Sequence, residues 1–305
     1  MTISASLVKD LRAKTSAGMM DCKKALMETK GDFDAAVDWL RTKGLSAAAK
    51  KVGRIASEGL TALAVVGNKG AAIEVNSETD FVSRNHNFQN LVKEISELAV
   101  NVDDIESLKT AKTKSGKSVN EEIIANITTI GENITLRRMQ TISVQDGVIA
   151  SYVHNTSADN MGTISALVAL ESTGDKTKLM EVGRQIAMHI AASKPKTLNK
   201  DGVDQELIQK EKDIFTQQSR ESGRPDNIIE KMIDGRIRKF LEEIVLLEQT
   251  FVIDNKSKIS EVISNLSKDI GAPIELKSFI RFEIGEGVEK GEKNFADEVA
   301  AVASH

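Results

Sequence analysis

Cysteine, aromatic residues and long apolar runs are all scarce in this 305-residue chain. With Cys22 as its single cysteine, it cannot form an internal disulfide, a feature typical of proteins in a reducing cytosol. Aromatics make up 4% of the residues, and no apolar run approaches the roughly 20 residues of a membrane-spanning helix. The 41 basic residues are outnumbered by 45 acidic ones, which argues against nucleic-acid binding. The start, MTISASLVKDLRAKT, lacks the pattern of a secretory signal, so we expect a cytoplasmic protein with neither nucleic acid nor membrane as a partner.

Motifs for catalysis and ligand binding are also poorly represented. AKTKSGKS, residues 111–118, ends like a phosphate-binding P-loop, but it has Ala111 in place of the first glycine and lies between helical segments. GEGVEKG, residues 285–291, has Lys290 where a dinucleotide fingerprint has its third glycine. Cys22 and the four histidines show neither metal-site spacing nor a nucleophile–base pattern. We therefore expect no catalytic residue, no cofactor and no metal.

Two histidines have simple structural interpretations. His189 lies in an apolar helical segment, which favours an interior position with hydrogen bonds. His154 ends a strand beside a polar loop, which favours exposure.

Hydrophobic periodicity predicts a small helical bundle at the start of the chain. Residues 4–43 contain three short helical stripes, and Gly44 would end the third helix. The stripes comprise Leu7, Val8, Leu11, Met19, Met20, Ala25, Leu26, Phe33, Val37 and Leu40. A linker, AAAKKVGRIASEG, would lead out of the bundle.

From Leu60 the apolar period changes to two, which predicts strands. LTALAVV, GNKG and AAIEVN form a hairpin pattern, followed by a helix after Phe88, a second helix near 119–129 and a strand in NITLRRMQTISV. The same order recurs in GVIASYVH, TISALVALE, KTKLMEVGRQIAMHIA, KISEVISNLSKDI and IELKSFIRFEI. The chain is therefore predicted to be α+β, with two similar halves that each place helices on an antiparallel sheet.

An additional segment, residues 200–248, interrupts the second half. Helical apolar spacing lies on both sides of ESGRPD, within a surface rich in Lys, Glu, Arg and Gln. This composition favours a projecting helical hairpin over two further core helices. Its remaining apolar edge could contact a partner or a second copy.

EVNSETDFVSRN, residues 74–85, carries an isolated phenylalanine among polar side chains. Phe88 follows Phe81 by seven residues, so periodicity alone favours a core position for Phe81 on the stripe of the following helix. In the alternative, Thr79 caps a short helical turn and Phe81 points outward. The residues by themselves leave both positions open.

Five segments resemble the elongation factor Ts family, the guanine-nucleotide exchange factors of elongation factor Tu. LRAKTSAGMMDCKKAL and EVNSETDFVSR resemble its two signature segments. IAMHIAASKP, SGRPDNIIEKMIDGRIRKF and FIRFEIGEG follow in the family's order, so the resemblance covers nearly the whole chain. The loop NTSADNMG is longer than usual for the family, and the residues after Gly291 match it only loosely.

The resemblance implies a domain organisation that agrees with the periodicity. A ubiquitin-associated-like three-helix bundle would precede a core of two α+β halves, with an inserted coiled-coil hairpin and a C-terminal helical module. The expected ranges are 1–54 for the bundle, 55–145 for the first half, 146–199 and 249–285 for the second half, 200–248 for the hairpin and 286–305 for the module.

The resemblance also implies a non-enzymatic activity. The turn Thr79–Val82 would dock beside the magnesium site of GDP-bound elongation factor Tu, with Phe81 in a pocket and Asp80 making polar contacts. Displacing Mg²⁺ would accelerate GDP release, leave nucleotide-free partner and allow GTP to rebind. Further partner contacts would come from Arg12, Met19, Met20, Lys23 and His154, and the hairpin could support a homodimer.

Two functions of other classes compete with nucleotide exchange. One is a small-molecule NTP-binding enzyme that uses residues 111–118. The other is a non-catalytic adaptor whose N-terminal bundle binds helical or ubiquitin-like partners.

Overall fold

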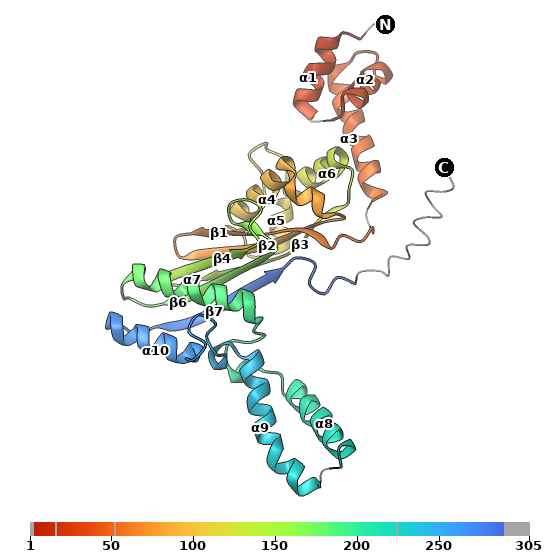
Figure 1. Cartoon of the computed structure of the whole chain (residues 1–305). Coiled ribbons are helices and arrows are strands. Elements are labelled where there is room, and N and C mark those ends of the chain that lie inside the picture. Colours follow the sequence, from red (N-terminus) through yellow and green to blue (C-terminus); the bar gives the residue numbers. More distant parts are fainter. Residues whose placement is uncertain (1–2, 16, 52, 224, 290–305) are drawn as a thin grey trace.

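The computed structural model of the chain describes residues 3–15, 17–51, 53–223 and 225–289. Residues 290–305 of the expected C-terminal helical module lie outside these ranges. The helices are α1 (Ala5–Thr15), α2 (Met19–Glu28), α3 (Phe33–Ala49), α4 (His86–Ala99), α5 (Ile105–Thr110), α6 (Val119–Ile130), α7 (Lys176–Ser193), α8 (Gln205–Glu221), α9 (Asp226–Ile244) and α10 (Ile259–Ile270) (Figure 1). The strands are β1 (Glu58–Val66), β2 (Lys69–Ser77), β3 (Ile134–Ser143), β4 (Gly147–His154), β5 (Met161–Gly162), β6 (Ile164–Glu171) and β7 (Glu275–Glu283), and three short 3₁₀ turns are η1 (Asp80–Arg84), η2 (Lys200–Gly202) and η3 (Leu246–Glu248).

Two antiparallel sheets form the centre of the protein, with strand orders β3-β2-β1-β5 and β4-β6-β7. In each sheet, the second strand of the hairpin lies between the first strand and the strand that follows the helices. The α+β class and the two similarly built halves are therefore confirmed. The halves are also joined directly, because β5 of the second half pairs with β1 of the first.

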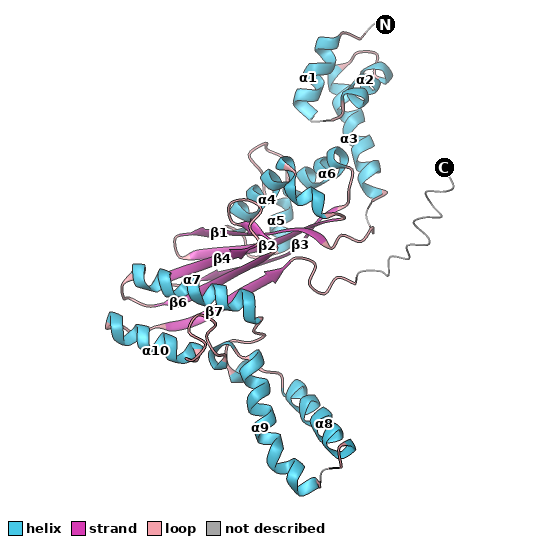
Figure 2. Cartoon of the chain, viewed as in Figure 1, coloured by secondary structure: helices cyan, strands magenta, loops and turns pink. Residues whose placement is uncertain are grey.

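The two sheets face each other, and helices cover their outer faces (Figures 1 and 2). Alternation along each strand divides the side chains between the two faces. In β1 and β2, Leu60 and Ile73 pack under α4 and α6, while Leu63 and Ala72 face the second sheet. The shared core between the sheets comprises Leu63, Ala72, Ile142, Val144, Ile149, Leu167, Ala169, Ile280 and Phe282.

Helix α7 lies unusually close to the second sheet because it has a glycine at the contact. A Cβ built on Gly183 would lie 2.7 Å from the Cβ of Ala150 and 3.1 Å from Leu170. Such distances leave no room for a side chain, so Gly183 sets the depth at which α7 packs.

The N-terminal helices pack around Leu11, Cys22, Leu26, Ala36 and Leu40. The prediction that the third helix ends at Gly44 is wrong, because α3 continues to Ala49. Its second half packs on α6, where a Cβ at Gly44 would lie 3.1 Å from Thr128 Oγ1. Contact with α6 thus compensates the weak helix propensity of glycine, and the first residues of the expected linker are helical.

The segment inserted in the second half is a pair of antiparallel helices, α8 and α9, which project from the sheets (Figure 1). An apolar cluster anchors its base, where Val203, Ile244 and Val245 are buried beside Leu207, Ile208, Phe240 and Leu241. Further out, Arg236 pairs with Glu211 at 2.6 Å across the two helices. Within the described ranges, no helix is long and apolar enough to cross a membrane.

Candidate functional site

The turn after β2 presents adjacent apolar side chains in opposite directions. Phe81 is 76% exposed, whereas Val82 is buried in the core of the first half. The core position that periodicity favours for Phe81 is therefore not adopted. Phe81 belongs to η1 and Phe88 to α4, and the extended residue Asn85 separates the two elements, so their seven-residue spacing does not describe one helical face.

Side-chain hydrogen bonds continue the β2–β3 pairing beyond its last backbone pair, Ser77 and Ile134. Glu132 Oε2 accepts from Thr79 N at 2.9 Å, and Glu132 Oε1 accepts from Thr79 Oγ1 at 2.7 Å. In the opposite direction, Glu78 Oε1 accepts from the backbone N–H of Asn133 at 2.6 Å. The turn is thereby fastened to the loop between α6 and β3.

The expected capping role of Thr79 is only partly correct. Thr79 occupies the N-cap position of η1 but makes no side-chain cap hydrogen bond. Its hydroxyl hydrogen is instead donated to the carboxylate of Glu132. The contact between Glu132 and Thr79 could not be predicted from the sequence, because the two residues lie 53 positions apart. The pairing of β2 with β3 brings them together.

Further hydrogen bonds stabilise the turn from within. Ser77 Oγ donates to Thr79 O at 3.0 Å, and Ser83 Oγ donates to Asp80 O at 2.6 Å. Gln89 of α4 donates to Ser83 O at 2.9 Å. With Val82 buried beneath it, this network holds a short, polar turn whose outward groups include the Phe81 ring and the exposed Asp80 side chain.

The N-terminal candidate residues Arg12, Met19, Met20 and Lys23 are all exposed on α1 and α2. Assigning Met19 and Met20 to the apolar core stripe was wrong, since they are 55% and 75% exposed. The inward face of α2 is formed by Cys22, Ala25 and Leu26, at spacings of three and four residues. The two methionines are therefore available for contact with another molecule.

His154 and His189 occupy the environments that their sequence contexts predict. His154 is exposed at the end of β4, and its Nδ1 lies 3.2 Å from Tyr152 Oη. His189 is fully buried, with Nε2 2.9 Å from Gln249 Oε1 and Nδ1 accepting from Val252 N at 3.3 Å. Burial lowers the pKa of His189, and the hydrogen bond with Gln249 opposes this effect.

The P-loop-like segment lies between α5 and α6, with its polar groups used internally. Ser118 caps α6 in a capping box with Glu121, and Thr113 Oγ1 donates to Lys117 O at 2.9 Å. Lys117 also lies 3.6 Å from Glu122. These residues serve the loop and the helix start, without the preceding strand that a P-loop requires.

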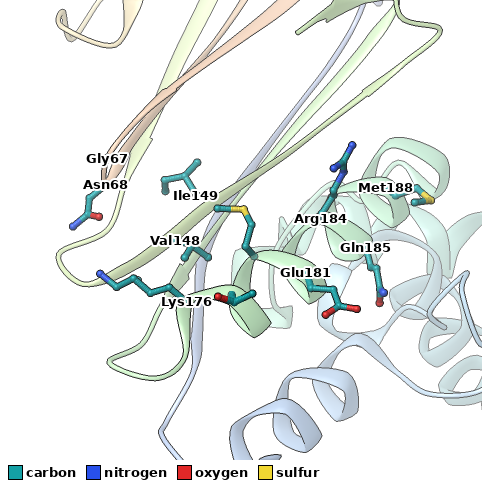
Figure 3. Close-up of a pocket in the computed structure, with 12 residues that line it drawn as sticks. Gly67, Asn68, Val148, Ile149, Lys176, Glu181, Arg184, Gln185 and Met188 are labelled. Carbon is teal, nitrogen blue, oxygen red and sulfur yellow. The ribbon is translucent and has the colours of Figure 1, made fainter. Parts of the chain in front are cut away.

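A hollow of about 830 Å³ lies between the β1–β2 turn, β4 and α7. Its charged side chains Lys176, Glu181 and Arg184 point in different directions, and the lining also includes Ile149 and Met188 (Figure 3). None of the sequence-predicted site residues lines it. Across the described ranges, no three His, Cys, Asp or Glu side chains are grouped so that they could hold a metal ion.

Comparison with known proteins gives a consistent result over nearly the entire chain. The family model for elongation factor Ts matches residues 78–286. Elongation factor Ts of Rickettsia bellii (strain OSU 85-389) is 58% identical over 303 residues, which cover 99% of this chain and 98% of that protein. Elongation factor Ts of Rickettsia felis (strain ATCC VR-1525 / URRWXCal2) is also 58% identical, and that of Rickettsia rickettsii (strain Sheila Smith) is 57% identical, each with the same coverage.

Proposed function

The chain belongs to the elongation factor Ts family of translation elongation factors, which exchange nucleotide on elongation factor Tu, and we propose that its Phe81 turn drives this exchange. The observation that carries the proposal is the 76% exposure of Phe81 on a turn held by several hydrogen bonds. An exposed aromatic ring contributes little to the stability of its own fold and can instead be buried against a partner.

In this mechanism, the turn docks on GDP-bound elongation factor Tu and Phe81 enters an apolar pocket beside the partner's magnesium site. Asp80 makes polar contacts there, while Thr79 and Val82 fix the turn. Mg²⁺ screens the charge of the diphosphate, so displacement of the groups that hold the ion weakens metal and GDP binding together. Arg12, Met19, Met20, Lys23 and His154 supply further contacts that hold the partner.

Thermodynamic linkage sets the order of events. If this protein weakens GDP binding by a given factor, GDP weakens the binding of this protein by the same factor. The nucleotide-free partner is therefore bound most tightly, and GTP rebinding releases it. Such a cycle requires no catalytic side chain and no cofactor of the chain's own, and we place it in the cytoplasm.

Stopped-flow release of fluorescent GDP from elongation factor Tu tests the role of Phe81. Burying a phenylalanine side chain contributes about 2–3 kcal/mol, so Phe81→Ala should slow release by roughly 30- to 150-fold. Ile253→Ala is the matched control, because Ile253 is also exposed but lies in another part of the molecule. Both variants should melt near the wild-type temperature, whereas truncation of a core phenylalanine would cost about 3–5 kcal/mol.

The competing functions give different results in the same assay. Wild-type release rates with Phe81→Ala would reject the proposed role. An adaptor would bind helical or ubiquitin-like partners through its N-terminal bundle and leave the GDP release rate unchanged. An NTP-binding enzyme would bind labelled GTP or ATP in the absence of any partner.

A further inference from the structure

Among the interactions of the described residues, Glu132 is the residue whose side chain accepts from both donors of Thr79, the backbone N–H and the hydroxyl. Its two oxygens accept from the backbone N–H and from the hydroxyl of Thr79, two residues before Phe81. Both bonds are charge-assisted, and their lengths of 2.9 and 2.7 Å are typical of such bonds.

Glu132 has no other evident task. Among the residues that the structure describes, no lysine or arginine forms an ion pair with it, in contrast to Glu78, which lies 3.6 Å from Arg54 Nη1. Glu132 also lies beyond the end of α6, which Gly131 terminates in the left-handed conformation at φ 92°. Within the described ranges, the carboxylate therefore neither caps a helix nor neutralises a cation, and its hydrogen bonds are directed to the turn.

The position of Glu132 continues the sheet. β2 and β3 pair as far as Ser77 and Ile134, and continuing that pairing would set Thr79 opposite Glu132. The backbone ladder stops there, and the carboxylate of Glu132 replaces it by accepting the N–H that a strand partner would otherwise bond. Thr79 thereby stays attached to the residues that lead into β3, although the chain has already left the sheet.

We propose that Glu132 is a positioning residue for nucleotide exchange, which holds Thr79 so that Phe81 is presented in its docking orientation before the partner arrives. This inference rests on the proposed role of Phe81. Without Glu132, the turn would sample other orientations, and the free energy of ordering it would be added to the step in which Phe81 enters the partner. Glu132 itself touches neither the nucleotide nor the metal.

The first test compares Glu132→Ala with Glu132→Gln in stopped-flow GDP release at increasing concentrations of the variant. We expect Glu132→Ala to lower the maximal release rate about tenfold, as the loss of charge-assisted hydrogen bonds would. The concentration for half-maximal rate should change little, because the further contacts proposed to hold the partner, from Arg12, Met19, Met20, Lys23 and His154, are unchanged. Glutamine can still accept from Thr79 N and donate to Thr79 Oγ1, so Glu132→Gln should recover most of the rate.

A second test separates positioning from general loss of structure. If Glu132 acts only through Phe81, the double variant Phe81→Ala/Glu132→Ala should release GDP no more slowly than Phe81→Ala alone. Glu106→Ala is the control, because it also removes one glutamate charge, from an exposed ion pair with Lys109 on α5. This variant should release GDP at the wild-type rate. Thr79→Val lacks the hydroxyl donor but keeps the backbone N–H, so its GDP release rate should lie between those of wild type and Glu132→Ala. If Glu132→Ala proves unstable, Thr79→Val tests the same contact from the other side.

The outcomes distinguish the two proposals. The positioning role would be overturned if Glu132→Ala released GDP at the wild-type rate. It would also be overturned if Glu132→Ala slowed release by the same factor in Phe81→Ala as in the wild type. Either result would leave the role of Phe81 intact. A wild-type rate for Phe81→Ala would instead reject the proposed function on which the inference rests.

Discussion

At the scale of single residues, the turn after β2 shows how the burial of one side chain supports the exposure of its neighbour. Val82 is 4% exposed and anchors η1 in the core of the first half, so the adjacent Phe81 is directed to solvent. In a 3₁₀ turn, consecutive residues are rotated by about 120°, which prevents both from facing the same core. Burial of Val82 in this turn therefore fixes the outward direction of the Phe81 side chain.

His189 gives the molecule a pH-dependent stability. Burial lowers its folded-state pKa below the value near 6.5 of the unfolded chain, so the unfolded state binds more protons between the two values. Stability should therefore be fully present above about pH 6.5 and fall as the pH decreases, by at most about 1.4 kcal/mol per pH unit. Urea unfolding at pH 7.5 and 5.5 measures this difference.

His189→Asn provides the control, because asparagine cannot become protonated. The loss of stability between pH 7.5 and 5.5 should largely disappear in this variant. Hydrogen bonds from Lys200 and Lys258 lower the pKa of Glu248. The stability that Glu248 contributes is also lost in acid, but only as the pH falls below about 4.5, the pKa of this carboxyl in the unfolded chain. An unchanged pH dependence in His189→Asn would contradict the assignment to His189.

At the scale of elements, the helical hairpin is structurally separable from the exchange turn. Its base holds an apolar cluster around Ile244 and Val245, and backbone hydrogen bonds of Ile244 and Leu246 with Lys196 and Thr197 join it to the second half. Further out, Glu211 and Arg236 face each other across the two helices. Replacing residues 212–235 by a short glycine–serine linker should therefore preserve the base. Since Phe81 lies in the first half, stopped-flow GDP release should remain within about twofold of wild type.

The same variant tests self-association. We propose that the hairpin can mediate a homodimer, since Ile214 and Ile228 expose apolar surface on it. Analytical ultracentrifugation should then show weaker self-association after the replacement. Loss of exchange by a folded variant would show that the hairpin takes part in the reaction, and an unchanged mass distribution would reject the homodimer.

Most elements could be predicted from the sequence because each has one buried face with a regular period. The exceptions depend on contacts distant in sequence. α5 spans only six residues, and β5 has two residues that pair with β1. The last turns of α3 require α6, whose Thr128 packs against Gly44. Each of these features is too short or too dependent on a neighbour to leave a period of its own.

The site was predictable to a similar degree. The resemblance identified the segment around Phe81, but periodicity assigned the ring to the core because it assumed one continuous helix from Phe81 to Phe88. Glu132 could not be found from a single sequence, since a lone glutamate after a helix gives no signal. Its contact with Thr79 follows only once the register of β2 and β3 is known.

At the scale of the whole molecule, a buried carboxylate ties the two halves together beside their shared apolar core. Glu74 of β2 is fully buried and accepts from Arg137 Nη1 at 2.9 and 3.1 Å, from Gly285 N at 2.9 Å and from Arg138. The Arg138 guanidinium also lies 4.2 Å from the centre of the Phe282 ring. The first sheet and the segment after β7 are thereby joined, and we expect the two halves to unfold as one unit.

The N-terminal bundle, by contrast, has a small core of its own and meets the first half through the end of α3, where Ala48 is buried in the core of that half. Its polar links to the first half include the exposed pair of Arg41 with Glu121, the Thr128–Gly44 hydrogen bond and the contact of Lys51 with Gly131 O. An exposed ion pair such as Arg41–Glu121 contributes about 0–1 kcal/mol. A core of this size is marginal by itself, so the bundle should unfold before the two sheets.

Trp39, the chain's single tryptophan, packs against the bundle core and reports on it alone. In urea, we expect its fluorescence to change at a lower midpoint than the far-UV circular dichroism, which is dominated by the remaining elements. Leu26→Ala, in the bundle core, should lower the fluorescence midpoint. Leu167→Ala, between the sheets, should lower the dichroism midpoint. Each substitution should reduce the free energy of unfolding of its part by about 2–5 kcal/mol. Coincident midpoints in the wild type, or a shift of both signals by either variant, would show that bundle and sheets unfold as a single cooperative unit.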